Sequence, residues 1–319
     1  MKTIDHLRRT IITAMLLSPL GNIARAGKPA GSAALRIGYQ KFGTLVLLRE
    51  YGALDTLQVQ HNISAKWTEF PAGPQLLEGL NVGSIDFGTT GETPPIFAQA
   101  AGADLVYVGY APASPAGEAI VVPENSPVVS VAQLKGQRVA LNKGSNVHYL
   151  LIQALQKAGL SYSDIEPVYL PPSDARAAFE RGSVAAWVIW DPFLAAAEIQ
   201  LSARVIQNGQ GLVNNNTFYL GTKAYAQQNP GVIVDLLGQI KKMNSWAQNN
   251  LQEVTRFVSP QLGLSEEIVL RSLQRISFDV NYIDDDIIEY QQNIADVFAR
   301  LKLIPHPVAV SNAIWRPPV

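Results

Sequence analysis

The sequence predicts an α/β protein built from two lobes, and three observations support this prediction. Short apolar segments with strand character alternate with helical segments along most of the chain, which is the pattern of βαβ units. The alternation breaks at a proline- and glycine-rich segment, residues 111–117, and restarts beyond it. The chain has 319 residues, of which 47% are hydrophobic and 16% charged, so it can bury more than one core.

The first lobe begins with a predicted strand at 35–39 and a helix at 42–51. Strands and helices then follow one another at short spacing. They comprise strands at 65–70, 84–91 and 104–110 and helices at 73–83 and 93–103. Pro74 lies in the first turn of its helix, where the missing N–H costs nothing. We expect these strands to be parallel, because βαβ units produce parallel sheets.

The second lobe repeats the same architecture without a repeat of fixed period. Its predicted strands are 118–122, 137–141, 166–170 and 185–193, and its helices lie near 130–134, from Ser145 onward and at 174–182. Residues 215–230 then carry a further strand that leads into helices, and 231–319 is mostly helical. The chain is therefore expected to build one lobe, cross to a second and return to the first.

These elements divide the chain into residues 33–114 and 221–319 for the first lobe and 115–220 for the second. Two crossings, near 111–118 and 212–222, are expected to form a hinge with a cleft between the lobes. In open α/β sheets ligands bind beyond the carboxyl ends of the strands, so the turns that leave the strands of both lobes should face this cleft.

The N-terminus has the features of an export signal. Lys2, Arg8 and Arg9 provide a basic start, and residues 11–20 are mostly apolar. Ala24-Arg25-Ala26 supplies small residues at the two positions that a signal peptidase reads. The sequence thus predicts a cleaved signal peptide at 1–26 and a periplasmic location. Export by the general route is favoured over the twin-arginine route, because the residues flanking Arg8-Arg9 fit the latter poorly.

Composition excludes several functional classes. A net charge of -1 gives no reason to expect a nucleic-acid partner. The chain has no cysteine, which excludes disulfides, thiol catalysis and a lipid-modified cysteine anchor. The four histidines are scattered along the chain, so no metal site is expected. No catalytic motif and no G-x-G-x-x-G loop is present, so neither an enzyme nor a bound cofactor is predicted.

Three turns that leave predicted strands carry polar groups suited to a ligand. They are Thr89-Thr90-Gly91-Glu92, Lys143-Gly144-Ser145-Asn146 and Trp190-Asp191-Pro192-Phe193. The first two lead into helix N-termini, whose free N–H groups and partial positive charge suit a small anion. The third contains Trp190 and Phe193, which together with Phe218, Tyr39 and Tyr110 could form aromatic walls around an apolar tail of the ligand. The alternative interpretation is that Thr93 and Ser145 only cap helices, as such residues commonly do.

Two titratable residues in these turns have more than one interpretation. His148 follows Ser145 in the first turn of a helix, where it either bonds a ligand or is a partly exposed helix histidine. Glu92 either partners a helix dipole or faces the ligand. In the second case it would repel an anion unless that ligand also carried a cation.

Four segments together carry a resemblance to a known family. They are RIGYQK, the run from Phe70 to Gly109 that includes GSIDFGTTGETPP, KGSNVHYLL and DARAAFERGSVAAWVIWDP. In these segments the chain resembles the periplasmic aliphatic sulfonate-binding proteins of ABC importers, over about 35–315. The resemblance implies a type II periplasmic-binding-protein fold that closes on an alkanesulfonate. It also implies a monomer that delivers its ligand to a membrane permease with a cytoplasmic ATPase, for sulfur acquisition.

Carried over by position, the resemblance implies specific ligand contacts. Gln40, Thr90, Gly91, Ser145 and Asn146 would hold the sulfonate, and His148, Trp190, Asp191 and Phe218 would line the remainder, with Glu92 a further candidate. The segments 41–58 and 214–225 and the pair Asn146-Val147 depart from the family pattern, which bears on selectivity for the tail. Taurine, nitrate or another small anion therefore stay open as ligands, as does an enzyme on the same fold.

Overall fold

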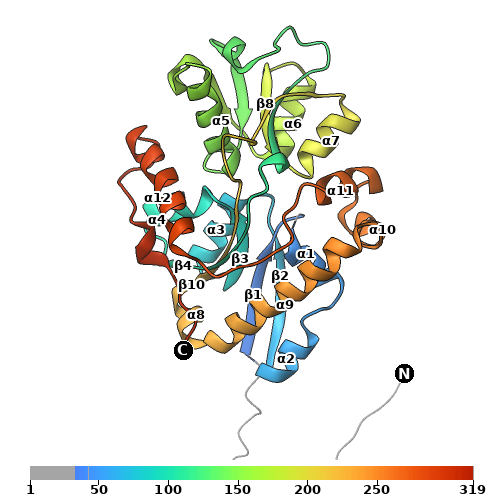
Figure 1. Cartoon of the computed structure of the whole chain (residues 1–319), viewed down its shortest axis with the longest axis vertical. Helices are drawn as coiled ribbons and strands as arrows, with labels where there is room; N and C mark the ends of the chain where they lie inside the picture. The colour runs from blue at the N-terminus through green and yellow to red at the C-terminus, as the bar shows by residue number, and fades with distance from the viewer. Residues whose placement is uncertain (1–32, 42, 319) are drawn as a thin grey trace, which may run out of the picture. The chain divides into compact units, whose positions relative to one another are not determined.

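The computed structural model describes residues 33–41 and 43–318, which form one compact unit; the predicted signal peptide lies outside the described residues. This unit contains two five-stranded sheets (Figure 1). The first has the order β2-β1-β3-β10-β4, with β1 (Ala33–Tyr39), β2 (Ile63–Glu69), β3 (Phe87–Gly91), β4 (Leu105–Ala111) and β10 (Thr217–Thr222). The second has the order β7-β6-β8-β5-β9, with β5 (Glu118–Val122), β6 (Arg138–Leu141), β7 (Glu166–Tyr169), β8 (Ala186–Trp190) and β9 (Arg204–Asn208). The α/β class is thereby confirmed.

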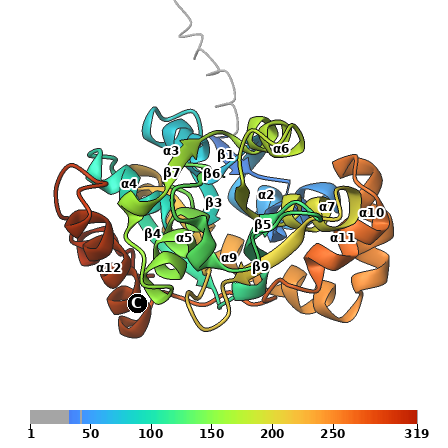
Figure 2. The ribbon, with the colours of Figure 1, turned by 90° about the horizontal axis from the view of Figure 1, so that it is seen from above.

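Helices cover both sheets, and most of them belong to the first. Its helices are α1 (Thr44–Glu50), α2 (Asp55–His61), α3 (Gly73–Asn81), α4 (Pro94–Ala100), α8 (Lys223–Gln228), α9 (Pro230–Asn249), α10 (Leu251–Leu262), α11 (Glu266–Leu273) and α12 (Asp285–Arg300). The second sheet carries α5 (Asn146–Lys157), α6 (Pro172–Glu180) and α7 (Phe193–Gln200). Short 3-10 turns are η1 (Pro115–Gly117), η2 (Val131–Leu134), η3 (Tyr162–Asp164) and η4 (Val310–Ala313). Seen from above, α12 and the pair α10–α11 lie on opposite sides of the molecule (Figure 2).

The predicted elements match the structure closely, apart from three that were not predicted: α2, α7 and β9. The predicted strand at 185–193 ends at Trp190, and α7 starts three residues later. The predicted lobe boundary at residue 220 falls inside β10, whose pairing with β3 begins at Thr217. The assignment of 115–220 to one lobe stays a prediction.

The four strands that were expected to be parallel, β1 to β4, run in one direction, whereas two other strands run opposite to their neighbours. β10 is antiparallel to β3 and β4, and β5 is antiparallel to β8 and β9. Both are the first strands that the chain forms after crossing from one sheet to the other. No β-helix-β connection within one sheet delivers them, so nothing forces them into the direction of their neighbours.

Side-chain alternation along the strands explains how the core is divided. In β4, Val106 and Val108 pack with α1, α9 and α10, whereas Leu105 and Tyr107 pack with α3, α4 and α12. The period of two thus sends alternate residues to opposite faces of the first sheet. The cluster that includes α12 is continuous with the core of the second sheet, and the ring of Phe298 in α12 lies 5.2 Å from that of His148 in α5. This continuity ties the two sheets together.

A buried acid fixes the central strands of the first sheet. Asp86, just before β3, accepts hydrogen bonds from the backbone N–H and Nε of Arg36 in β1, each at 2.9 Å. The backbone carbonyl of Asp86 also accepts the N–H of Thr222, at the end of β10, at 2.9 Å. One residue therefore aligns three strands that are far apart in the sequence.

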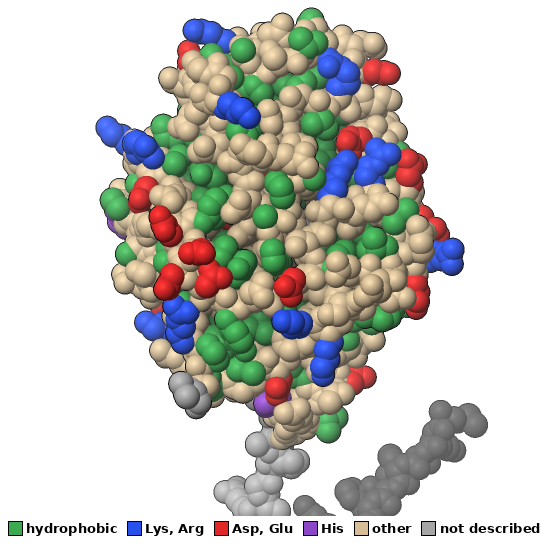
Figure 3. Space-filling view, in the orientation of Figure 1, with side chains coloured by type: hydrophobic (Ala, Val, Ile, Leu, Met, Phe, Trp, Pro, Cys, Tyr) green, Lys and Arg blue, Asp and Glu red, His purple; other side chains and the backbone are tan. Residues whose placement is uncertain are grey.

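The face drawn in Figure 3 carries both basic and acidic side chains, and neither kind forms a dominant patch. Acidic side chains gather there over the start of α12, where Asp284, Asp285 and Asp286 are exposed. Asp284 caps this helix, because its Oδ1 accepts the N–H of Ile287 at 2.9 Å. No helix among residues 33–41 and 43–318 is long and apolar enough to cross a membrane.

Replacing Asp86 tests its aligning role. Asp86→Ala should lower the free energy of unfolding by about 2 kcal/mol, because it removes the buried carboxylate that accepts hydrogen bonds from the backbone N–H and the guanidinium group of Arg36. Urea denaturation followed by circular dichroism measures the change. Asp285→Ala is the control, since that carboxylate is 96% exposed and its pair with Arg316 should contribute about 0.5 kcal/mol or less. Equal effects of the two substitutions would contradict the assignment.

Candidate functional site

A cavity of about 70 Å³ lies between the two sheets, beyond the carboxyl ends of β1, β3 and β8. Its first-sheet wall comprises Gln40, Gly43, Thr44, Gly73, Thr89, Thr90, Gly91, Ala111, Thr217 and Tyr219. The second-sheet wall and the crossings contribute Ser114, Gly117, Asn146, Trp190 and Asn215, and the segment after α11 adds Ile276 and Ser277. A single small molecule held here touches residues from both sheets.

The first-sheet wall is built where parallel strands end and helices begin. β1 and β3 end at this edge, and α1 and α3 start from it with Thr44 and Gly73. Gln40 donates a hydrogen bond from Nε2 to the carbonyl of Thr89 at 3.1 Å. Thr90 donates from Oγ1 to the carbonyl of Gly91 at 2.9 Å. The wall is thereby held rigid by its own hydrogen bonds.

The second-sheet wall centres on Asn146, the first residue of α5. Its Nδ2 donates to Oε2 of Glu118 and, at 2.9 Å, to Oδ1 of Asn215. Asn146 also approaches Gly91 so closely that a Cβ on Gly91 would lie 2.8 Å from the Asn146 side chain. Only a residue without a side chain allows the end of β3 and the start of α5 to meet this way.

No charged side chain is among the described residues that line the cavity. They offer hydroxyls, amides and backbone groups, with Trp190, Ala111 and Ile276 as apolar surface. The first N–H groups of α5 have no partner within the helix and point toward its N-terminus. These groups suit a small anion, which neutral donors bind without burying a cation.

Five of the ten candidate ligand contacts line the cavity: Gln40, Thr90, Gly91, Asn146 and Trp190. The other five, Glu92, Ser145, His148, Asp191 and Phe218, are buried behind it. Phe218 packs edge-on against Tyr107 with ring centroids 5.1 Å apart, inside the core. Of the added aromatic residues, Tyr39, Tyr110 and Phe193 do not line the cavity, whereas the unpredicted Tyr219 does.

The alternative interpretation, that Ser145 and Thr93 only cap their helices, was wrong, because neither side chain makes a capping hydrogen bond. Ser145 Oγ instead donates to the carbonyl of Asn142 at 2.7 Å, which closes the turn before α5. The helix after Thr90-Gly91 was also expected to offer N–H groups to a ligand. This expectation is not met, because α4 begins with Pro94-Pro95, which lack N–H groups, and its start does not line the cavity.

His148 is a fully buried packing residue, and the expectation of a partly exposed helix histidine was wrong. The Gly144 N–H donates to its Nδ1 at 3.3 Å, so Nε2 carries the proton and donates to Tyr162 Oη at 2.9 Å. Its ring lies 5.2 Å from that of Phe298. Burial, aided by the charge of Lys143, lowers the pKa of His148 to about 3. The residue is therefore neutral at physiological pH.

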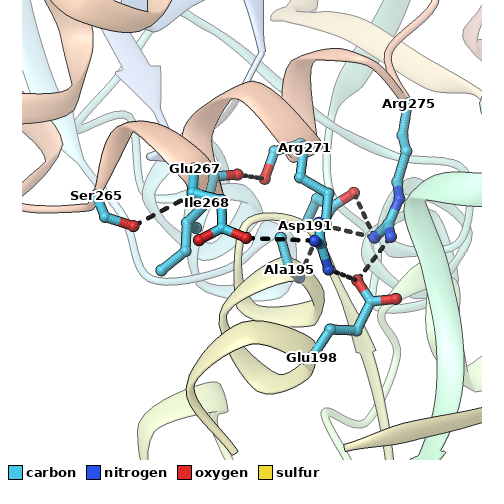
Figure 4. Close-up of polar contacts among 9 residues, drawn as sticks. Asp191, Ala195, Glu198, Ser265, Glu267, Ile268, Arg271 and Arg275 are labelled. Atoms are coloured by element: carbon cyan, nitrogen blue, oxygen red, sulfur yellow. Dashed lines mark hydrogen bonds and ion pairs between the residues drawn. The ribbon is translucent and has the colours of Figure 1, made fainter. Parts of the chain in front are cut away.

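Asp191 follows the cavity residue Trp190 but does not line the cavity. Its side chain belongs to an ion-pair cluster with Arg275 and Glu198 (Figure 4). Its Oδ1 lies 3.3 Å from Nη1 of Arg275, whose Nη2 is 2.6 Å from Oε2 of Glu198. It also accepts the N–H of Ala195 at 3.0 Å. Burial raises the pKa of Asp191 to about 7, although Arg275 opposes the shift. The cluster joins α7 to the segment that follows α11, so it supports the site from behind.

Glu92 is the second buried acid near the site. It accepts the N–H of Asn216 at 2.8 Å and a hydrogen bond from Tyr290 Oη at 3.3 Å. Burial raises the pKa of Glu92 to about 7, against the lowering effect of these hydrogen bonds. Its contacts hold the crossing before β10 in place. Glu92 therefore positions Asn215 and Thr217, which line the cavity, without lining it.

The sequence analysis did not name about two thirds of the residues that line the cavity. Some of them could have been found from the sequence, and others could not. Thr44 and Gly73 begin helices directly after parallel strands, so the rule that located Gln40 and Thr90 also applies to them. Ile276 and Ser277 carry no such signal, because they follow α11 in a segment without regular structure. Among residues 33–41 and 43–318, no group of three or more acidic or histidine side chains could hold a metal ion.

Comparisons with known proteins identify the family of this chain. Residues 69–253 match the family model described as NMT1/THI5 like. An Escherichia coli (strain K12) protein described as aliphatic sulfonates-binding is 44% identical over 286 residues, which is 89% of each chain.

Two solved structures are similar over most of their length. The alkanesulfonate-binding protein SsuA from Xanthomonas axonopodis pv. citri, bound to MOPS, has a TM-score of 0.86 and 42% identity, covering 90% of this chain and 99% of that one. The periplasmic aliphatic sulphonate binding protein SsuA from E. coli has a TM-score of 0.82 and 43% identity, covering 89% and 92%. These three relatives are named as binding proteins. The chain belongs to the NMT1/THI5-like family, among its aliphatic sulfonate-binding proteins.

Proposed function

We propose that this protein binds alkanesulfonates between its two sheets and delivers them to an ABC importer. The observation that carries the proposal is the cavity whose described lining offers many hydrogen-bond donors and no charged side chain. The relatives named for sulfonate binding supply the ligand class.

The chemistry of the ligand fits an uncharged lining. A sulfonate stays singly charged at physiological pH, so it needs no proton acceptor in the site. Oriented neutral donors and the N-terminus of α5 stabilise it without the cost of burying Lys or Arg. The proposed contacts to the head group are the second N–H of Gln40 Nε2 and the backbone N–H of Asn146, with Trp190 against the tail. The hydroxyl groups of Thr44 and Thr90 donate to Asn244 Oδ1 and to the Gly91 carbonyl, so each would have to turn to reach the ligand.

The predicted signal peptide at 1–26 and the relative named periplasmic support a periplasmic location. There the mature protein would act as a monomer that opens and closes about the two crossings. Its partners would be a membrane permease and the cytoplasmic ATPase of the importer. The five other predicted ligand contacts do not line the cavity, and their contact with a ligand stays a prediction. They are Ser145, Glu92, His148, Asp191 and Phe218.

A ligand panel tests the proposal directly. Linear alkanesulfonates should raise the melting temperature at millimolar concentration, because a ligand that binds only the native state stabilises it. Taurine, nitrate and sulfate are measured in parallel by thermal-shift assay. Buffers must contain no sulfonate, since a relative binds MOPS. Stabilisation by nitrate or sulfate alone, or by none of the compounds, would rule out the proposed ligand class.

The close approach of Gly91 and Asn146 provides a test by substitution. Gly91→Ala should weaken alkanesulfonate binding by about tenfold or more, on the order of 1.4 kcal/mol, because the new methyl group separates the two walls. Isothermal titration calorimetry measures the affinity. Gly238→Ala is the matched control: this exposed glycine in α9 has no atom within 4 Å of an added Cβ. Wild-type affinity in Gly91→Ala would show that this contact does not shape the site.

A further inference from the structure

Glu118 is a fully buried acid directly behind the cavity, although it does not line it. It is the first residue of β5 and pairs across the sheet with Trp190, which does line the cavity. Its neighbour Gly117 also lines the cavity. A fully buried carboxyl group at such a position needs a structural or functional reason, because its desolvation is costly.

The contacts of Glu118 converge on the start of α5. Oε2 accepts a hydrogen bond from Nδ2 of Asn146. The orientation of that amide is fixed independently: Asn215 Nδ2 donates to the carbonyl of Ser114 at 2.9 Å, so Asn215 Oδ1 must accept from Asn146. Both N–H groups of the Asn146 side chain are therefore engaged, and its backbone N–H is the donor that the ligand can use.

This anchoring places Asn146 against Gly91. The position of a Cβ built on Gly91 would be 2.8 Å from Oδ1 and Cγ of Asn146. A different rotamer of Asn146 would move the first turn of α5 or open the contact between the walls. Glu118 and Asn215 together hold the rotamer that permits the contact.

The surroundings of Glu118 disfavour a negative charge. Among the described residues Oε1 has no hydrogen-bond partner, and the single partner of Oε2 is a neutral amide. Burial, together with the nearby charge of Glu92, raises the pKa of Glu118 well above its usual value. The elements around it carry further titratable or charged groups: His148, Tyr149 and Lys157 on α5, Arg204 on β9, Asp191 after β8, Tyr290 on α12 and Arg275 after α11. Arg275 is engaged with Asp191 and Glu198.

We propose that Glu118 is a positioning residue that serves the anion site as an uncharged carboxylic acid. It anchors Asn146 at the first turn of α5 without placing a negative charge behind the bound ligand. This inference rests on the proposed binding of an anion in the cavity. An acid whose pKa is raised stays protonated to higher pH, and its ionisation at high pH would weaken anion binding.

The charge of Glu118 can be observed in the intact protein. With glutamate labelled by ¹³C at the side-chain carboxyl, its NMR signal is assigned from its loss in Glu118→Gln. We expect the chemical shift of an uncharged acid at about pH 7, where a glutamate side chain in water is ionised. A carboxylate shift for Glu118 at this pH would overturn the proposal.

Binding of butane-1-sulfonate by calorimetry tests the positioning role. Glu118→Gln keeps an acceptor for Asn146 and carries no charge, so it should bind within about threefold of the wild type. Glu118→Ala removes the anchor and should bind about tenfold or more weakly, which is about 1.4 kcal/mol. Glu166→Gln, an exposed glutamate on β7, is the matched control.

The outcomes separate this inference from the proposed function. If the wild type does not bind the sulfonate, the proposed function fails. If it binds and Glu118→Gln is as weak as Glu118→Ala, a charged group is required and the inference fails. Equal affinity of Glu118→Ala and the wild type also overturns it. If Glu118→Ala does not fold, the affinity of Glu118→Gln and the NMR signal of Glu118 still test the inference.

Discussion

The close approach of Gly91 to Asn146 is the contact on which the site depends. β3 ends at Gly91 and α5 begins at Asn146, so the contact brings a strand end of one sheet against a helix start of the other. Because no side chain intervenes, the two walls enclose a cavity of about 70 Å³ rather than an open groove. Everything else near the site either lines this space or holds the two partners in position.

The acidic, basic and histidine side chains near the cavity lie behind its lining residues and are not among the described residues that line it. Asp191 and Arg275 neutralise each other one residue beyond Trp190, Glu92 holds the crossing at Asn216, and His148 is neutral among aromatic rings. These groups stabilise the architecture, whereas the described lining is uncharged. A monoanion is therefore met by oriented dipoles, whose alignment is set before the ligand arrives.

Some residues of the site could be predicted from the sequence pattern, and others could not. Gln40, Thr90 and Asn146 follow strand ends or begin a helix, so the rule for carboxyl ends located them, and it also applies to Thr44 and Gly73. Ser145 and His148 occupy the right segment, but their side chains face inward from α5 rather than toward the cavity. Sequence position defines a turn, whereas the direction of each side chain depends on packing around the helix.

The sequence by itself determined the α/β class, nearly all strands and helices, and the turns from which the site is built. These features follow from local periodicity, proline and glycine positions and helix starts. Only the tertiary structure decided the antiparallel direction of β5 and β10, the contribution of Ile276 and Ser277, and the burial of Glu118 and Asp191. These depend on contacts between segments tens to hundreds of residues apart, which local patterns do not encode.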